Sequence, residues 1–127
     1  MKRTTIVAKN APAAVGPYSH AVQVGDTVYT SGQLGLDPAT GKMAEGVEAQ
    51  ATQAIKNLKA ILETAGLSLA NVVKTTVFLT DIADFAKINK IYADYFTGET
   101  PARSCFQVAA LPMGGAFEIE AIAVKAE

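Results

Sequence analysis

Hydrophobic residues spaced three and four positions apart make residues 47–65 the clearest predicted helix of the chain. Gly66 follows the last turn, where a glycine commonly ends a helix. The apolar face consists of Val47, Ala51, Ala54, Ile55, Leu58, Ile61, Leu62 and Ala65, and the polar face of Glu48, Thr52, Lys56, Lys59 and Glu63. We therefore predict an amphipathic helix that covers one side of a core.

A second helix is predicted from Asp81 to about Phe96. Aspartate is a preferred N-cap residue, and Asp84 adds negative charge to the first turn, where the helix dipole favours it. Gly98 ends the segment. The predicted core face carries Ile82, Phe85, Ile88, Tyr92 and Phe96.

The remaining segments alternate between apolar and polar residues or are rich in β-branched residues, which is typical of strands. Gly25-Asp26 predicts a tight turn, and residues 37–42 predict a loop. The predicted strands are residues 3–8, 21–24, 27–31, 72–79, roughly 103–110 and 117–125. With no linker or repeat between these segments, we expect residues 1–127 to form a single domain.

The order of the elements, ββ(β)αβαββ, predicts an α+β fold in which two helices cover one face of a mixed sheet. The other face is too apolar to be left in water. In the strand 72–79, Val73, Val77 and Leu79 are predicted to point one way, and Val72 and Phe78 the other. Because the chain has no element left to cover the second face, we expect a homo-oligomer that packs sheet against sheet.

Composition excludes several functional classes. The 127 residues are 50% hydrophobic and 18% charged, which is typical of a globular domain. The net charge is −1 without a basic run, so we expect no nucleic-acid partner. No apolar run approaches the roughly 20 residues of a membrane span. One cysteine excludes an internal disulfide and suits a reducing cytoplasm, and one histidine with one cysteine predicts no metal site.

The candidate chemistry lies in the last quarter of the chain. Strand alternation places Arg103 and Cys105 on one face, and Glu118 and Glu120 together on one face of the following strand. Charges on apolar strands are costly unless they are paired or functional. A guanidinium matches a carboxylate in shape, and a carboxyl group can move a proton. The pattern predicts a site that binds a small carboxylic acid and performs acid–base chemistry on it.

Two points stay open at this stage. Either Glu118 or Glu120 is the acid–base group, because burial would raise the pKa of a carboxyl and a nearby arginine would lower it. Cys105 has no histidine partner in sequence, so we expect it to line the site rather than to act as a nucleophile.

The spacing of Arg103 and Glu118 raises a geometric problem. If the last two strands formed a simple hairpin around residues 111–116, Glu118 would lie opposite Ala109. Arg103 would then be about 20 Å away, too far to share a small substrate. Either the two strands are not direct neighbours in that register, or the site takes one group from another subunit. The second alternative agrees with the uncovered sheet face.

Five segments in order resemble one known family, and together they extend from about residue 9 to 125. They are Gly16-Pro17-Tyr18-Ser19, Thr30-Ser31-Gly32-Gln33, Val73-Lys74-Thr75-Thr76-Val77-Phe78, Pro101-Ala102-Arg103-Ser104-Cys105 and Ile119-Glu120-Ala121-Ile122-Ala123. On these segments the chain is similar to the Rid/YjgF family of reactive-intermediate deaminases, and Arg103 is the mark of its deaminase subgroup.

The resemblance implies a chorismate-mutase-like fold and a homotrimer with a barrel-like interior and three clefts between subunits. It implies hydrolysis of 2-aminoacrylate, 2-iminobutanoate and related enamines or imines to 2-keto acids and ammonia, without a cofactor. It places the carboxylate-binding arginine at Arg103 and the water-activating glutamate at Glu118. The substrate-binding residues that line the cleft would be Tyr18, Ser31, Gly32, Asn89 and Cys105.

The chain departs from the usual family pattern at several positions. His20 stands where glutamine is common, and Gly35 replaces a usual proline. Ala110 replaces an arginine, and residues 113–115 replace a Lys-Asp pair. We expect His20 to be a packing or turn residue. Asn89 either anchors neighbouring backbone or contacts the ligand. The rival functions are a regulator or chaperone-like protein that binds small carboxylates without turnover and, least favoured, a ribonuclease.

Overall fold

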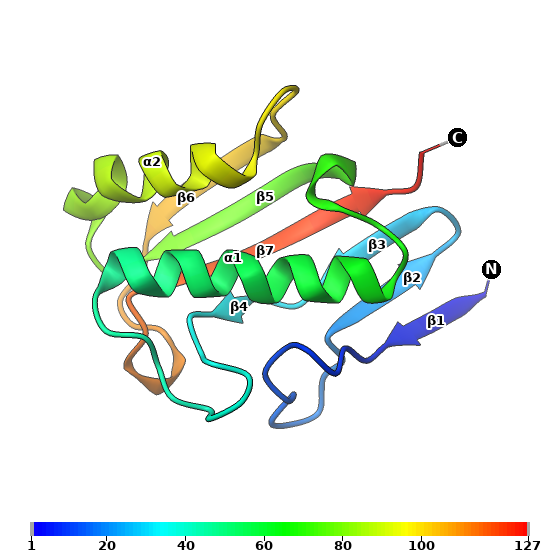
Figure 1. Cartoon of the computed structure of the whole chain (residues 1–127), viewed down its shortest axis with the longest axis horizontal. Coiled ribbons are helices and arrows are strands. Elements are labelled where there is room, and N and C mark those ends of the chain that lie inside the picture. Colours follow the sequence, from blue (N-terminus) through cyan, green and yellow to red (C-terminus); the bar gives the residue numbers. More distant parts are fainter. Residues whose placement is uncertain (1, 127) are drawn as a thin grey trace.

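The computed structural model describes residues 2–126, so Met1 and Glu127, the ends of the expected domain, lie outside the described residues. Figure 1 shows one sheet with two α-helices in front of it. The elements are β1 (Arg3–Ile6), β2 (Ala21–Val24), β3 (Thr27–Thr30), β4 (Gln33–Leu34), α1 (Val47–Thr64), η1 (Leu69–Asn71), β5 (Val72–Leu79), η2 (Ile82–Asp84), α2 (Phe85–Tyr95), β6 (Ala102–Gln107), η3 (Pro112–Gly114) and β7 (Phe117–Val124).

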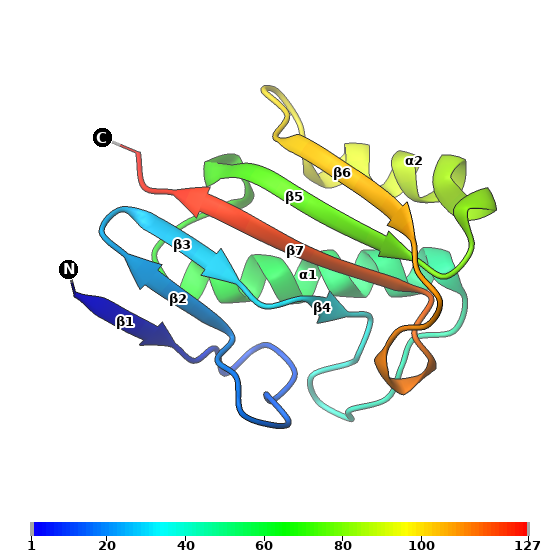
Figure 2. The ribbon, with the colours of Figure 1, turned by 180° about the vertical axis from the view of Figure 1, so that it is seen from behind.

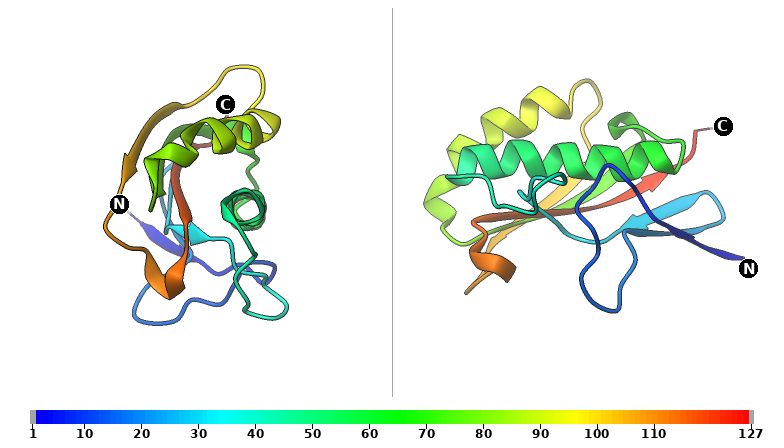
Figure 3. Two further views of the ribbon diagram at one scale, coloured as in Figure 1. Left: turned by 90° about the vertical axis from the view of Figure 1, so that its left-hand side faces the viewer. Right: turned by 60° about the horizontal axis from the view of Figure 1, so that its bottom comes forward.

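The sheet is mixed, and both helices cover the same face of it. Its strand order is β1-β2-β3-β7-β5-β6, with β4 pairing with β7 beside β3. Only β5 and β6 pair in parallel among the described strands. Figure 2 shows the other face from behind, with no element in front of it, and the edge-on view of Figure 3 shows both helices on one side. The predicted α+β architecture with two helices on one face is confirmed.

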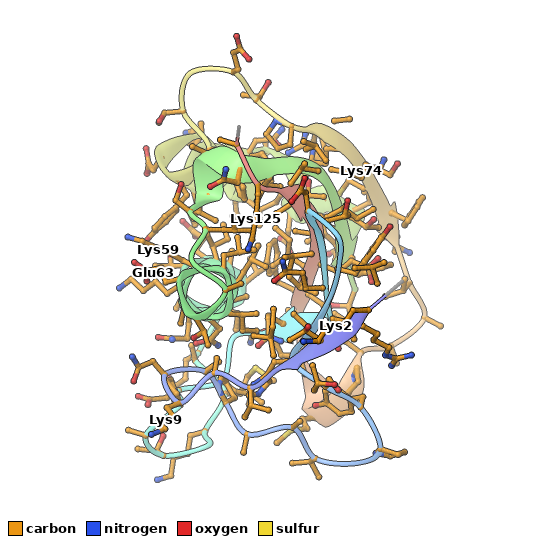
Figure 4. All side chains as sticks on the ribbon, turned by 90° about the vertical axis from the view of Figure 1, so that its right-hand side faces the viewer. Lys2, Lys9, Lys59, Glu63, Lys74 and Lys125 are labelled. Atoms are coloured by element: carbon orange, nitrogen blue, oxygen red, sulfur yellow. The ribbon has the colours of Figure 1, made fainter. Side chains whose placement is uncertain are left out.

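Helix α1 supplies much of the core, as its periodicity predicts. Ile55, Leu58 and Leu62 are fully buried, and burial of such a side chain contributes about 1.5–3 kcal/mol. In Figure 4, Lys59 and Glu63 lie on the outer side of α1, away from the sheet. The helix ends one residue earlier than predicted, at Thr64. Gly66 follows with φ +79°, a left-handed conformation that glycine adopts without a Cβ clash.

Two buried amide side chains of α1 were not predicted, and they fix two loops of the structure. The Nδ2 atom of Asn57 donates to the carbonyl oxygens of Leu34 and Leu36, at 3.0 and 2.9 Å. The Oε1 atom of Gln50 accepts the backbone N–H of Ala116 at 2.7 Å. The helix therefore holds β4 and the segment before β7 through side-chain hydrogen bonds as well as apolar packing.

The second helix starts later than predicted. Asp81 caps the 3-10 turn η2 by accepting the backbone N–H of Ala83 at 2.9 Å, and α2 begins only at Phe85. Ile82 is 46% exposed, so its placement on the core face was wrong. The reason is that Ile82 lies in the 3-10 turn, before the helical repeat that orients Ile88 and Tyr92 toward the core.

Strand β5 has the predicted bounds but an irregularity at its start. The register shifts between Val72 and Lys74, as at a β-bulge. Val72 is consequently buried and Val73 is 49% exposed, so the predicted faces of these two residues were wrong. Beyond the shift, Val77 and Leu79 are fully buried on the helix side as predicted.

Other strand bounds differ by a few residues. Strand β1 ends at Ile6, β6 at Gln107 and β7 at Val124, and the two-residue strand β4 was not predicted. A strand of two residues is too short to show an alternating pattern. Among residues 2–126, no helix has the length and apolarity to cross a membrane, and no cluster of three potential metal ligands is present.

Candidate active site

Strand β5 lies between β6 and β7, which decides one of the open alternatives. Arg103 pairs with Thr75, and Glu118 pairs with Phe78 on the other side of β5. The two strands are therefore not direct neighbours, and the simple hairpin is ruled out. Two strand spacings and three residues along the strand separate the Cα atoms of Arg103 and Glu118 by about 14 Å.

The two side chains also point to opposite faces of the sheet. Arg103 contacts residues of α2 and thus faces the helix layer. Glu118 alternates with Phe117 and Ile119, which are buried under the helices, so it points to the uncovered face. Arg103 and Glu118 of one chain cannot hold the same small ligand.

We use the term half-site for the surroundings of either Arg103 or Glu118 in one chain. The half-site around Arg103 is built by α2 and β6. The Nη1 atom of Arg103 donates to Oδ1 of Asn89 at 2.8 Å. The guanidinium carbon lies 4.7 Å from the ring centroid of Tyr92 and 5.2 Å from that of Phe85. The faces of such rings attract a cation, and they leave the outer edge of the guanidinium group free. Asn89, for which the sequence allowed a backbone or a ligand contact, positions the guanidinium.

A shallow pocket of about 380 Å³ opens beside Arg103, between α2 and the start of β6. No carboxylate within residues 2–126 forms an ion pair with this guanidinium. A half-buried arginine without an acidic partner is suited to bind an anion from outside the chain. The pocket therefore fits the expected role of Arg103 in binding a carboxylate.

Two further ionisable groups on the helix side of the sheet stay neutral. Burial raises the pKa of the Tyr92 phenol, whose oxygen is 2.8 Å from Oγ1 of Thr75. Burial also raises the pKa of the Cys105 thiol, which outweighs the lowering effect of Arg103. A protonated thiol is a poor nucleophile. The raised pKa therefore argues against covalent catalysis, but Cys105 is not among the residues that line the pockets beside Arg103 and Glu118, so its expected lining role stays a prediction.

The half-site around Glu118 is a larger pocket on the other side of β7. It has a volume of about 510 Å³, and its walls include Tyr18, Ser31, Gly32 and Glu118. The segments 12–15 and 112–113 supply apolar walls. The structure thus brings four of the predicted site residues together here, while Arg103 and its partner Asn89 lie in the other half-site. Cys105 shares the strand face of Arg103 but lines neither pocket.

Glu118 is half-buried and lies directly against backbone. A Cβ atom on Gly32 would be 2.7 Å from Oε2 of Glu118, so only glycine leaves room for the carboxyl group in this position. Burial, and to a smaller extent the charge of Glu120, raises the pKa of Glu118. Glu118 therefore keeps its proton to a higher pH than a carboxyl group in water.

Glu120 lies two residues further along the same face of β7, but it is exposed and does not line the pocket. In this geometry its carboxylate acts on Glu118 through charge. The position and the pKa shift favour Glu118 over Glu120 as the acid–base group, and the catalytic role itself stays a prediction.

His20 is a packing residue, as expected. It is 4% exposed, and both of its ring nitrogens bond to backbone, at Ala8 and Pro12. The hydroxyl of Ser31 donates to the carbonyl oxygen of Ser19 at 2.5 Å. Both residues therefore fix the loop between β1 and β2, which forms one wall of the Glu118 pocket.

Comparisons with known proteins agree with this architecture. A family model described as endoribonuclease L-PSP matches residues 8–125. The chain belongs to the Rid/YjgF family. The 2-iminobutanoate/2-iminopropanoate deaminase of Mus musculus is 56% identical over 97% of this chain and 92% of its own length. The deaminase of the same name from Salmonella typhimurium is 53% identical over 95% of this chain and 97% of its own length.

Solved structures of Rid proteins superpose closely on the chain. RidA of the Antarctic bacterium Psychrobacter has a TM-score of 0.94 and 54% identity, with 96% of this chain and 99% of that one covered. The E. coli protein TdcF, solved with bound serine, has a TM-score of 0.94 and 45% identity, with 97% and 99% covered. The family expected from the five segments is thus confirmed.

Some site-building residues of this Rid protein were missed from the sequence. Phe85 and Tyr92 were assigned to the core alone, yet their rings flank Arg103. Gln50 and Asn57 were not singled out, although they hold the loops behind the Glu118 pocket. A signal for the two amides was present, because both lie seven residues apart on the apolar side of α1.

Proposed function

We propose that this Rid protein hydrolyses small 2-imino acids, such as 2-iminobutanoate and 2-iminopropanoate, to 2-keto acids and ammonia. The observation that carries the proposal is the pair of half-sites. One presents an arginine without an acidic partner, and the other presents a half-buried carboxyl group whose pKa is raised. Relatives more than 50% identical over nearly the whole chain are named for this reaction.

The complete site forms between two copies of the chain, and three copies close a ring. The support is that Arg103 and Glu118 face opposite sides of one sheet, so only a neighbour can bring the missing half. A head-to-tail contact of this kind generates a closed ring when its rotation closes. The trimer is also the assembly that the family resemblance implies.

The uncovered sheet face is the surface that assembly would bury. Tyr29 and Phe106 are each 49% exposed there, and the rings of Phe78 and Phe106 pack with centroids 6.0 Å apart. A contiguous apolar surface on a small domain is typical of an interface between proteins. Sheet-to-sheet packing of three copies would give the barrel-like interior expected from the sequence.

In the proposed reaction, Arg103 of one copy binds the substrate carboxylate, and Glu118 of the next copy handles the protons. Protonated Glu118 gives its proton to the imine nitrogen, which makes C2 electrophilic. The resulting carboxylate takes a proton from water as the water oxygen bonds to C2. The same carboxyl group then protonates the amine nitrogen. The C2–N bond breaks, ammonia leaves, and the hydroxyl proton returns to Glu118 as the keto group forms.

The raised pKa of Glu118 suits this cycle because the group must be both a proton donor and a proton acceptor near neutral pH. Ribonuclease activity, named in the description of the family model, has less support in this chain. Its one histidine is buried with both ring nitrogens bonded to backbone, so it cannot serve as an acid or base on RNA.

The test is keto-acid release from imines made in situ by a threonine or serine dehydratase. We expect the protein to accelerate release of 2-ketobutyrate or pyruvate, and Glu118→Gln to lower the rate about a hundredfold or more. Glu63→Gln, an exposed carboxylate on the outer side of α1, is the matched control and should keep full activity.

A protein that binds 2-ketobutyrate or serine without accelerating release would be a carboxylate-binding regulator instead. That result, or full activity of Glu118→Gln, would overturn the proposed function. Binding and turnover are therefore measured on the same preparation.

A further inference from the structure

His20 is the one histidine of the chain, and its hydrogen bonds fix its protonation state. Nδ1 accepts the backbone N–H of Ala8 at 2.9 Å, and Nε2 is 2.7 Å from the carbonyl oxygen of Pro12. A backbone amide can only donate, and a carbonyl can only accept. The ring is therefore neutral, with its hydrogen on Nε2.

These bonds lie within the connection between β1 and β2, residues 7–20, and join its beginning and middle to its end at β2. Pro12, Val15 and Tyr18 of this loop form a wall of the Glu118 pocket. At the other end of the same connection, the backbone N–H of Ser31 donates to the carbonyl oxygen of His20 at 2.9 Å. His20 thus joins the beginning of this loop to Ser31, which follows β3.

We propose that His20 is a positioning residue whose neutral ring holds the wall of the Glu118 half-site, and that its protonation releases this wall. A proton on Nδ1 would face the N–H of Ala8, so two donors would meet. The amide of Ala8, a residue 3% exposed, would lose its acceptor.

Few other ionisable groups surround the ring. Tyr18 of the same loop and Glu118 of β7 line the pocket that His20 also borders, and Lys9, next to Ala8, is exposed. No ion pair to His20 is present among the described residues. The effect of its protonation is therefore exerted through the two backbone hydrogen bonds.

Glutamine is the informative replacement. Its side-chain oxygen can accept the N–H of Ala8, and its NH₂ group can donate to Pro12, but it does not titrate. His20→Gln should keep the positioning function without the pH dependence, whereas His20→Ala should lose both hydrogen bonds.

The first experiment reads the ring directly, by long-range ¹H–¹⁵N NMR of the assembled protein. A single histidine gives one set of ring signals, and we expect the Nε2–H tautomer. On acidification, the backbone amide signals of Ala8 and Tyr18 should shift with the same midpoint as the ring. An Nδ1–H tautomer, or an Ala8 amide that does not follow the ring, would overturn the inference.

The second experiment compares pH–rate profiles of imine hydrolysis, and it rests on the proposed function. Each variant is normalised to its own rate at about pH 8. Over the pH range in which the NMR titration shows the ring gaining its proton, we expect His20→Gln to keep at least about threefold more of its rate than wild type, and His20→Ala to be impaired at every pH. Any pH dependence of the rate that comes from ionisation of Glu118 is the same in wild type and His20→Gln, so it cancels in this comparison.

Superimposed profiles of wild type and His20→Gln would overturn the inference. If His20→Gln does not fold, the NMR titration of wild type decides. If no keto acid is released by wild type at any pH, the proposed function fails, while the tautomer and the coupled amide shifts still test the role of His20.

Discussion

The two arginines of the chain, Arg3 and Arg103, have very different surroundings. Arg3 is exposed on β1, whereas Arg103 lies between the rings of Phe85 and Tyr92 with one nitrogen bonded to Asn89. Those contacts orient a planar group, which a lysine ammonium does not reproduce.

The first prediction follows from this difference. Arg103→Lys should lower kcat/KM for imine hydrolysis at least about tenfold, because a lysine loses one charged hydrogen bond and the bidentate contact with the substrate carboxylate. Arg3→Lys is the matched control and should leave kcat/KM unchanged. Near-normal kcat/KM in Arg103→Lys would show that the guanidinium does not bind the substrate.

Substitutions at two glycines are expected to distinguish an effect on activity from an effect on stability. A Cβ on Gly32 would meet the flexible end of Glu118, whereas a Cβ on Gly35 would lie 2.5 Å from the Cα atom of Gln50 in α1. Gly32→Ala should therefore displace the carboxyl group and lower kcat about tenfold or more with little loss of thermal stability. Gly35→Ala should instead lower the melting temperature. Equal effects of both substitutions on melting temperature would contradict this account.

The raised pKa of Glu118 also predicts how stability depends on pH. The folded protein binds this proton more tightly than the unfolded chain does. The stabilisation is complete below the unfolded-state pKa and is lost as the pH rises through the folded-state pKa. The glutamine of Glu118→Gln does not ionise, so this variant does not lose that stabilisation. Its melting temperature relative to that of wild type should therefore increase as the pH rises from about 4 to about 8. Glu63→Gln should show no such gain. If the difference in melting temperature between Glu118→Gln and wild type did not change with pH, the raised pKa would be contradicted.

At the scale of elements, the amides of α1 link the helix to the Glu118 half-site. Asn57 is 1% exposed, and its one NH₂ group serves two carbonyl oxygens. Asn57→Leu should destabilise the fold by about 1–3 kcal/mol, because two buried carbonyls lose their donor. Denaturant unfolding measures this, with the exposed Lys59→Ala as control. A change in unfolding free energy no larger than that of the control would show that these bonds are dispensable.

The long elements were predictable, and the short or irregular ones were not. Helix α1 and strand β5 bury regular apolar patterns over many residues, so their bounds were found within a residue. Strand β4, the register shift at Val73 and the turn η2 each depend on contacts with distant segments, such as Asn57 with Leu34. A local pattern cannot contain that information.

The strand faces of the candidate site residues were predictable, but the arrangement of their strands was not. Alternation put Arg103 and Cys105 on one face of their strand, and Glu118 and Glu120 together on one face of the following strand, and the structure agrees. The insertion of β5 between β6 and β7 was not predictable from the spacing, because strand order is set by the whole sheet. The partners of Arg103 and Glu118 on β5, Thr75 and Phe78, are three residues apart, and this odd offset places the two half-sites on opposite faces of the sheet.

At the scale of the whole molecule, the uncovered sheet face should control assembly. Phe106→Glu places a charge in the proposed interface while leaving the helix-side core of the same chain untouched, since Phe106 is 49% exposed. We expect a smaller particle by light scattering and loss of most imine hydrolysis. Lys59→Glu on the outer side of α1 should change neither. A fully active monomer would show that one chain holds a complete site.

The most direct measurement is complementation between two impaired variants. Arg103→Lys and Glu118→Gln are purified separately, mixed in equal amounts, dissociated and reassembled. A cleft between a Glu118→Gln copy and an Arg103→Lys copy can contain both native side chains, so random mixing should restore about one quarter of wild-type activity. If the mixture stays no more active than either variant alone although mixed oligomers have formed, the site does not combine Arg103 of one subunit with Glu118 of another.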